Sequence, residues 1–260
     1  LISVDVGRLD AQTVFCVFKV NAQKDFFAKK LVDIIVLQDK HFEEQAIELK
    51  RTIEAFSAKE VIVDGTGIGV GLLDFMIKDN IDEMGNFYPA IGVINDDDYL
   101  KKQPRGCRKL LYVIKLNPKL NSEIHSITFA ELMSGKIRFL IREQEAKAKL
   151  LATKAGSKLP PEKRIAALMP YEMTTRLIDE MCNLRAKRDT TGIALERING
   201  RMGKDKFSAF EYGIWRIKAL EEDHFRNLRD RNKRSPLSMI FYTPRRWVNF
   251  VRTKRSWAVC

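Results

Sequence analysis

Three apolar runs rich in β-branched residues occupy the first 40 residues of the chain. They cover Leu1–Val6, Thr13–Val20 and Leu31–Leu37, and polar stretches separate them at residues 7–12 and 21–30. Short apolar runs bounded by turn-forming residues are typical of strands. The pattern therefore predicts an antiparallel meander of three strands at the start of the chain.

The period of the apolar residues changes after the meander. Apolar side chains recur three or four positions apart from Phe42 to Phe56 among charged residues, which predicts an amphipathic helix over residues 41–57. The run Val61–Val63 then predicts a short buried strand that ends at Asp64. A strand, an acidic residue, a glycine-rich loop and a helix thus follow one another.

The rest of the chain continues to mix helical and strand-like patterns. We expect helices over residues 72–77, 105–116, 171–188 and 204–222, and strands over residues 90–94 and 191–198. Residues 143–170 are rich in Lys, Ala and Glu and include the pair Pro160-Pro161, which indicates a mobile or externally placed insertion. Together the elements predict an α/β domain over residues 1–222, with a mixed central sheet flanked by helices.

Composition narrows the class of protein. Of the 260 residues, 45% are hydrophobic and 31% are charged, which is the balance of a soluble globular protein. No uncharged apolar run reaches the roughly 20 residues that a membrane helix needs. The four cysteines form no C-x-x-C pair and the three histidines lie far apart, so we expect no zinc site and a reduced, intracellular protein. Because the chain opens on a strand without Met or a secretory signal, we expect a fragment of a longer polypeptide.

The positive charge is concentrated near the C-terminus. Residues 225–260 contain ten Lys or Arg and one acid, a net charge of +9 out of the formal +12 of the whole chain. Aromatic residues, among them Trp247 and Trp257, alternate with these cations. We therefore expect a basic tail over residues 223–260 that contacts nucleic acid. A tail that binds another protein, or nothing in particular, is the alternative.

Three acidic residues lie at the ends of predicted core elements. Asp5 interrupts the first apolar strand, Asp64 ends the strand Val61–Val63, and Asp205 opens the last amphipathic helix. An acid among apolar residues is costly to desolvate unless a cation pairs with it. If the first and fourth strands are neighbours and the last helix packs over the sheet, the three carboxylates meet at one place. Oxygen-only ligation fits Mg²⁺ or Mn²⁺, and two such ions would activate a water and stabilise the leaving oxygen in phosphodiester cleavage.

Each acid also has an ordinary structural interpretation. Asp5 could form a turn before Gly7, Asp64 an Asx-turn, and Asp205 a helix N-cap. The glycines of residues 65–71 follow the spacing G-x-G-x-G-x-G rather than G-x-G-x-x-G, so they form no dinucleotide fingerprint. We expect these glycines to let a phosphate approach Asp64, with a purely structural turn as the alternative.

The motifs around the three acids resemble the C-terminal nuclease domain of the large terminase subunit of tailed bacteriophages. The segments that carry the resemblance are Ile2–Gly7, Val61–Gly69 and Gly203–Ala209, and the resemblance covers residues 1–222. It implies a ribonuclease H-like fold and a divalent-metal-dependent endonuclease that cuts double-stranded viral DNA during genome packaging.

The same resemblance implies roles and partners. Asp5, Asp64 and Asp205 would be the catalytic, metal-binding acids, with Mg²⁺ or Mn²⁺, two ions in number, as the cofactor. The implied partners are double-stranded DNA, an N-terminal packaging ATPase in the parent chain, the portal and the small terminase subunit, in the cytoplasm of the infected bacterial host. One departure is Ser208, at a position where the family often carries a further acid.

Residues expected to hold a DNA strand surround the acids. They are Arg8, Gly65, Thr66, Gly67, Arg201, Lys204 and Lys206. The three acids also fit a junction resolvase or a transposase core. An actin-like ATPase or sugar-kinase lobe stays open, because it too combines an acid after the first strand with a later glycine-rich phosphate loop. A third alternative is a non-catalytic module that binds DNA or a portal, mainly through the basic tail.

Overall fold

The computed structural model describes residues 1–7, 11–190 and 192–234 and divides the chain into two compact units, Leu1–Lys218 and Ala219–Cys260. The strands are β1 (Ile2–Asp5), β2 (Thr13–Ala22), β3 (Phe27–Leu37), β4 (Val61–Asp64), β5 (Asn80–Ile81), β6 (Phe87–Tyr88), β7 (Ile91–Val93), β8 (Arg108–Ile114), β9 (Ile137–Arg138), β10 (Leu184–Asp189) and β11 (Gly192–Arg197). The helices are α1 (Phe42–Ala55), α2 (Gly69–Met76), α3 (Asp97–Lys102), α4 (Pro118–Met133), α5 (Glu143–Ala152), α6 (Lys154–Ser157), α7 (Pro161–Cys182) and α8 (Asp205–Arg234).

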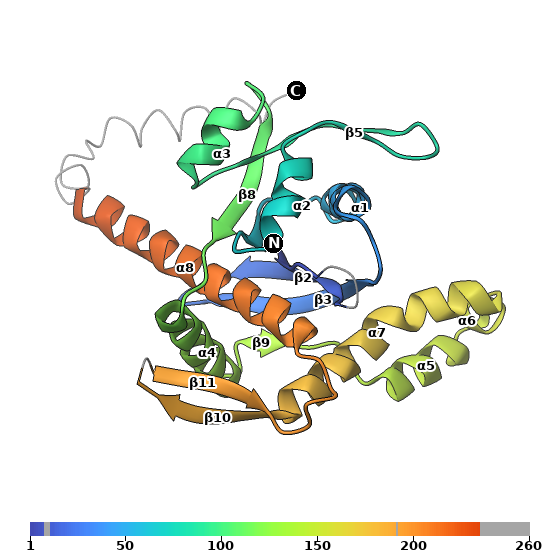
Figure 1. The fold of residues 1–260 in the computed structure, drawn as a ribbon. Helices are drawn as coiled ribbons and strands as arrows, with labels where there is room; N and C mark the ends of the chain where they lie inside the picture. The colour runs from blue at the N-terminus through green and yellow to red at the C-terminus, as the bar shows by residue number, and fades with distance from the viewer. Residues whose placement is uncertain (8–10, 191, 235–260) are drawn as a thin grey trace, which may run out of the picture. The chain divides into compact units, whose positions relative to one another are not determined.

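A seven-stranded mixed sheet forms the centre of the first unit, in the order β7-β8-β4-β1-β2-β3-β9 (Figure 1). Strands β1, β2 and β3 pair antiparallel, whereas β4 pairs parallel with β1 on one side and with β8 on the other. The predicted meander and the predicted contact between the first and fourth strands are both confirmed. The result is the ribonuclease H-like α/β arrangement expected from the sequence, with a mixed sheet flanked by helices.

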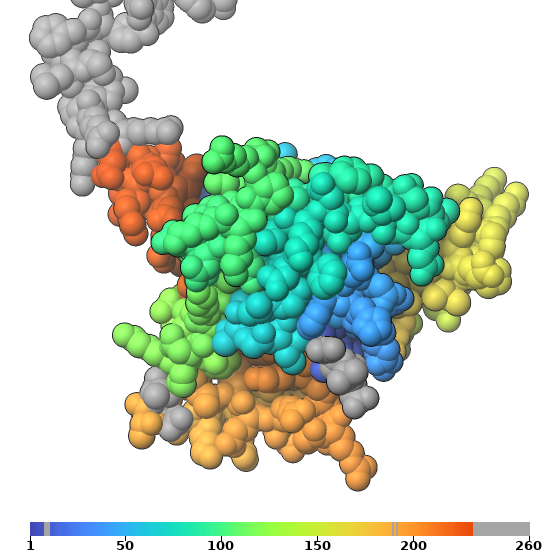
Figure 2. All heavy atoms as spheres, turned by 45° about the horizontal axis from the view of Figure 1, so that its top comes forward, coloured from blue at the N-terminus to red at the C-terminus, as the bar shows by residue number. Residues whose placement is uncertain are grey.

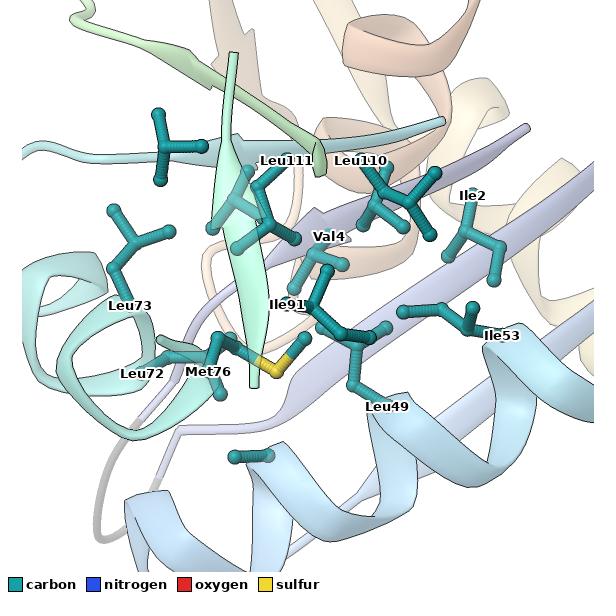
Figure 3. Packing of buried hydrophobic residues seen from close by; sticks show 14 of the residues in the cluster. Ile2, Val4, Leu49, Ile53, Leu72, Leu73, Met76, Ile91, Leu110 and Leu111 are labelled. Carbon is teal, nitrogen blue, oxygen red and sulfur yellow. The ribbon is translucent and has the colours of Figure 1, made fainter. Parts of the chain in front are cut away.

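One face of the sheet is covered by α1 and α2. Because successive strand residues point to opposite faces, Ile2 and Val4 of β1 point toward this layer and contact Leu49 and Ile53 of α1. Figure 3 shows these side chains interdigitating with Leu72, Leu73 and Met76 of α2. Burying each such side chain contributes about 1.5–3 kcal/mol, so this layer fixes the position of β1 and β4.

The other face of the sheet carries α8, α7 and α4. Cys16 and Phe18 of β2 pack against Phe207, Phe210 and Ile214 of α8, together with Leu177 of α7. Ile62 of β4, which points away from α1, contacts Ile124 of α4 and Tyr212 of α8. The predicted last amphipathic helix is therefore confirmed, and it begins at Asp205 as expected.

Two predicted helices are wrong in whole or in part. Residues 105–116 were expected to be helical, but Arg108–Ile114 forms β8. Leu110, Leu111, Val113 and Ile114 are all buried, because β8 lies between β4 and β7 and has apolar layers on both faces. A continuous apolar run of this kind does not distinguish a central strand from a buried helix.

The helix predicted over residues 171–188 ends at Cys182. Residues Leu184–Asp189 instead form β10, which pairs antiparallel with β11. β11 lies within the strand predicted over residues 191–198. The hydrophobic pattern of β10 is weak because four of its six residues are charged, so the pairing with β11 decides its structure.

Residues 143–170 form α5, α6 and the first part of α7. Figure 1 shows this segment extending away from the sheet, and its yellow part lies at the right of Figure 2 as well. Ala146 and Gly156 are its buried positions, and the other residues are exposed or partly exposed.

The second unit contains the last part of α8, to Arg234. Within it Arg226 lies 3.6 Å from Asp223, and the rings of His224 and Phe225 meet edge to face. The predicted basic tail begins in this part of the helix, and its residues 235–260 lie outside the described residues. Across the part of the chain that the structure describes, no helix combines the length and the apolar character needed to cross a membrane.

Candidate functional site

Asp5 and Asp64 end neighbouring parallel strands. The register pairs Val4 with Val63, so the next residues of the two strands are the two aspartates. Ser3 and Ile62, two residues before each acid, both contact the α8 side of the sheet. Because alternate strand residues share a face, both carboxylates point toward α8.

Short side chains bring α8 close to these strand ends. The Ser3 hydroxyl donates to the carbonyl oxygen of Ala209 at 2.5 Å, and the Cys16 thiol lies 3.8 Å from the carbonyl oxygen of Lys206. Gly213 packs against Phe18 and Ser3 so closely that a Cβ atom would overlap both. These contacts hold the first two turns of α8 over β1 and β2, with Asp205 at the helix start.

A buried ion pair anchors the start of α8 to α7. Glu180 accepts a hydrogen bond from the backbone N–H of Phe207 through Oε2 and one from Lys206 Nζ through Oε1, both at 3.0 Å. Lys206 Nζ also donates to Gln12 at 3.1 Å. Glu180 therefore satisfies a first-turn N–H that has no partner within the helix, and it fixes the position from which Asp205 projects.

The negative charges of Asp64 and Asp205 both act on the buried carboxyl group of Asp5. The pKa of Asp5 is raised to about 7, most strongly by burial and further by the negative charges of Asp205 and Asp64. Glu211 raises it further, whereas the cation of Lys204 lowers it. A carboxyl group with such a pKa is poorly solvated and has more negative than positive charge acting on it. This is the environment expected for a cation site or for an acid–base group.

Asp64 is held by the loop that follows it. Its Oδ1 atom accepts hydrogen bonds from the backbone N–H of Thr66 at 2.8 Å and from the Thr66 hydroxyl at 2.6 Å. The same hydroxyl accepts a hydrogen bond from the backbone N–H of Leu116 at 3.0 Å. Burial raises the pKa of Asp64, and the two bonds from Thr66 oppose that increase. The Asx-turn expected as the structural alternative for Asp64 is thus present, on the same side chain that faces Asp5.

The donor set fits a hard divalent cation by its chemistry, since it consists of carboxylate oxygens with unbalanced negative charge. Within residues 1–7, 11–190 and 192–234, however, no three His, Cys, Asp or Glu side chains form a group that could hold one metal ion. Asp5 interacts with Asp205 and with Asp64. The three acids are brought to one edge of the sheet, and their side chains would have to turn to share an ion.

A fourth acid, which the sequence analysis missed, lies beside this site. Glu211 of α8 is buried, and its Oε2 atom lies 2.6 Å from Nδ1 of His125 in α4. Burial raises the pKa of Glu211, and His125 and Lys204 oppose the increase. A signal was present in the sequence, because Glu211 falls on the same helical stripe as Phe207 and Ile214.

Backbone conformation and close packing both favour glycine in the loop after β4. Gly67 has a φ of +57°, which favours glycine, and the Cα of Gly69 approaches the carbonyl oxygen of Asp64 too closely for a side chain. Gly65 packs against the side chain of Val113. Close contacts thus favour glycine at positions 65 and 69, whereas backbone conformation favours it at Gly67, which is exposed beside Thr66.

The predicted cationic DNA contacts fall into different environments. Arg8 lies outside the described residues. Arg201 and Lys204 are exposed in the connection between β11 and α8, and Lys204 acts electrostatically on Asp5. Lys206 is buried in its ion pair with Glu180, which gives it a structural partner instead of a free surface position.

A groove of about 560 Å³ opens at Asp205. Three arginines from separate elements line it: Arg176 of α7, Arg197 of β11 and Arg201 of the following turn. Asp179 and Glu180 contribute negative charge to the same groove. The groove thus offers exposed guanidinium groups next to one of the three acids.

The chain aligns with solved structures of one viral nuclease. The large terminase nuclease from thermophilic phage G20c with bound magnesium aligns with a TM-score of 0.48 and 12% identity, over 82% of this chain and 78% of that chain. The same nuclease with bound cobalt aligns with a TM-score of 0.45 and 13% identity, over the same shares of the two chains. No family model matches the chain, and no curated protein matches it.

Proposed function

We propose that this chain is a divalent-metal-dependent endonuclease that cuts double-stranded DNA. The observation that carries the proposal is the placement of Asp5, Asp64 and Asp205, from β1, β4 and α8, at one edge of the sheet, where the charges of Asp64 and Asp205 both act on Asp5. The sequence resemblance to the terminase nuclease domain supports the same reaction.

In this proposal the three aspartates would hold two Mg²⁺ or Mn²⁺ ions through their carboxylate oxygens. Such ions polarise a phosphodiester group and lower the pKa of water. Asp64 presents one carboxylate oxygen while Thr66 holds the other, and Glu180 fixes the start of α8 so that Asp205 stays in place. Arg176, Arg197 and Arg201 bind the phosphates of a strand that lies in the adjacent groove.

The biological setting follows from the resemblance. We propose that the substrate is viral DNA cut during genome packaging in the cytoplasm of a bacterial host. The partners would be a packaging ATPase in the same polypeptide, the portal and the small terminase subunit. The basic segment after residue 223 would add affinity for DNA through its charge.

The test is incubation of the chain with supercoiled plasmid in Mn²⁺, Mg²⁺ or EDTA. We expect nicking and linearisation with either metal, no cleavage in EDTA, and no cleavage by Asp64→Ala. The matched control is Asp25→Ala in the exposed turn between β2 and β3, which should cut like the wild type. Normal cleavage by Asp64→Ala would overturn the proposal.

A further inference from the structure

The Thr66 hydroxyl connects a candidate metal ligand to the central sheet. It donates to Asp64 Oδ1 at 2.6 Å and accepts from the backbone N–H of Leu116 at 3.0 Å. Asp64 ends β4 and Leu116 follows β8, the parallel neighbour of β4. The hydroxyl therefore links the end of β4 to the residues that follow β8.

The direction of the hydroxyl proton is set by its partners. A threonine hydroxyl has one proton to donate and two lone pairs to accept with. The N–H of Leu116 can only donate, so it occupies a lone pair, and the proton is left for the carboxylate of Asp64. A DNA phosphate oxygen also needs a donor. Thr66 can donate its hydroxyl proton to a phosphate only by releasing Asp64, which argues against the DNA-contact role expected from the sequence.

The two bonds from Thr66 both reach the same oxygen of Asp64. The backbone N–H lies 2.8 Å from Oδ1, and Oδ2 accepts no hydrogen bond from any residue that the structure describes. A carboxylate held at one oxygen keeps the other oxygen free and fixes its orientation. Loop contacts reinforce this, since the N–H of Gly65 donates to the carbonyl oxygen of Ile114 at 2.8 Å.

We propose that Thr66 is a positioning residue whose hydroxyl orients Asp64 so that Oδ2 is presented for binding a divalent metal ion. This inference rests on the proposed function. It assigns Thr66 to metal binding rather than to DNA binding. The effect is exerted through Asp64, and Thr66 itself makes no contact with the ion.

The test compares Thr66→Val, which removes the hydroxyl at nearly constant volume, with Thr66→Ser, which keeps it. Mn²⁺ binding is measured by titration calorimetry without DNA, so the readout does not depend on cleavage. We expect Thr66→Val to bind Mn²⁺ about tenfold more weakly than the wild type, because hydrogen bonds to charged groups are the stronger ones. Thr66→Ser should bind within about twofold of the wild type.

Two further measurements separate positioning from other roles. Affinity for duplex DNA in EDTA should be unchanged in Thr66→Val, whereas a DNA-contact role predicts weaker binding. Raising the Mn²⁺ concentration should restore plasmid cleavage by Thr66→Val but not by Asp64→Ala. Thermal unfolding of each variant in EDTA confirms that the chain is folded, which the exposed position of Thr66 favours.

Several outcomes would overturn this role. Mn²⁺ binding by Thr66→Val equal to that of the wild type would do so, as would a loss of binding in Thr66→Ser as large as in Thr66→Val. In either case the nuclease proposal survives if Asp64→Ala still abolishes metal-dependent cleavage. A wild-type chain that neither binds Mn²⁺ nor cuts DNA would instead overturn the proposed function and this role with it.

Discussion

Individual carboxyl groups at the edge of the sheet are held where negative charge is costly. Asp5 has neighbours of the same sign in Asp64, Asp205 and Glu211, and Lys204 is the cation that opposes them. Glu211 has a partner in His125, which lowers the free-energy cost of burying its charged carboxylate. A site with this excess of acids is less stable by itself than with a bound cation, because ligands that bind only the folded state stabilise it.

The raised pKa of Asp5 predicts a pH dependence of the metal-free chain. The unfolded chain releases this proton near pH 3.8, whereas the folded chain keeps it up to about pH 7. Between these values the folded state binds more protons, so the free energy of unfolding should fall as the pH rises from about 4 to about 7. The loss should be up to about 4 kcal/mol. Urea unfolding in EDTA across this pH range measures it.

The matched variant for that experiment is Asp5→Asn, which keeps the shape and removes the titration. In EDTA at pH 7.5 we expect Asp5→Asn to be more stable than the wild type and its stability to change less between pH 4 and 7. Added Mg²⁺ should stabilise the wild type and leave Asp5→Asn nearly unchanged. Equal pH profiles for the two proteins would contradict the assignment of the charge excess to Asp5.

Some of these residues could be predicted from the sequence and others could not. Asp5 and Asp64 interrupt or end apolar runs, so a single chain is enough to single them out. Glu211 carried a similar signal within an apolar helical stripe. No sequence pattern marks the role of Glu180. Its partners Lys206 and Phe207 lie 26 and 27 residues away, and only the folded chain brings them together.

At the scale of elements, the position of α8 depends on small residues. Ala209 is fully buried, and a Cβ at Gly213 would overlap the ring of Phe18 and the hydroxyl of Ser3. Glycine costs about 1 kcal/mol within a helix, so its presence here needs a packing reason. Without a side chain at position 213, α8 packs closer to β1 and β2. This close packing brings Asp205 toward the ends of the strands.

Gly213→Ala should therefore lower stability, although alanine is the better helix former. We expect a net loss of about 1–3 kcal/mol in the free energy of unfolding, measured by urea titration, because overpacking forces neighbouring groups to move. Phe18→Leu in the same background should recover part of the loss by making space. A Gly213→Ala variant that is more stable than the wild type would show that α8 is not held this closely.

The ion pair at the start of α8 gives a second prediction for this element. Glu180→Gln leaves Lys206 charged in a buried position, which should lower the free energy of unfolding by about 3–5 kcal/mol. The control is Glu172→Gln on the same helix, whose pair with exposed Arg176 should contribute less than about 1 kcal/mol. Thermal unfolding of both variants tests it, and equal effects would argue against the anchoring role of Glu180.

The misassigned elements show where local pattern fails. The antiparallel meander and α1 were predicted because turn residues or a clear helical period mark them, although β3 begins at Phe27, four residues before the predicted start at Leu31. β8 was wrongly predicted as a helix, because burial on both faces removes the alternation that identifies a strand. β10 was also missed, because it is a strand only through its pairing with β11.

At the scale of the whole molecule, the three acids and the main positive charge occupy different parts of the chain. Asp5, Asp64 and Asp205 all lie within Leu1–Lys218, whereas residues 225–260 carry a net charge of +9. This separation predicts that cleavage and DNA affinity can be changed independently. The alternative, a non-catalytic module that binds mainly through its tail, predicts that metal is irrelevant and that binding disappears with the tail.

Ending the chain after Arg234 separates these two hypotheses. The truncation removes five basic residues and no acidic one, and it leaves every described element intact. For a nuclease, we expect weaker binding to duplex DNA and a salt dependence shallower by up to about four to five units of slope, since each phosphate contact contributes about 0.9. Metal-dependent cleavage at saturating DNA should persist, because the acids are untouched.

A full-length chain with the same five basic residues changed to Gln is the control, and it should match the truncated chain if charge alone is responsible. Loss of all DNA binding by the truncated chain, together with no cleavage by the full-length chain in any metal, would favour the binding module instead.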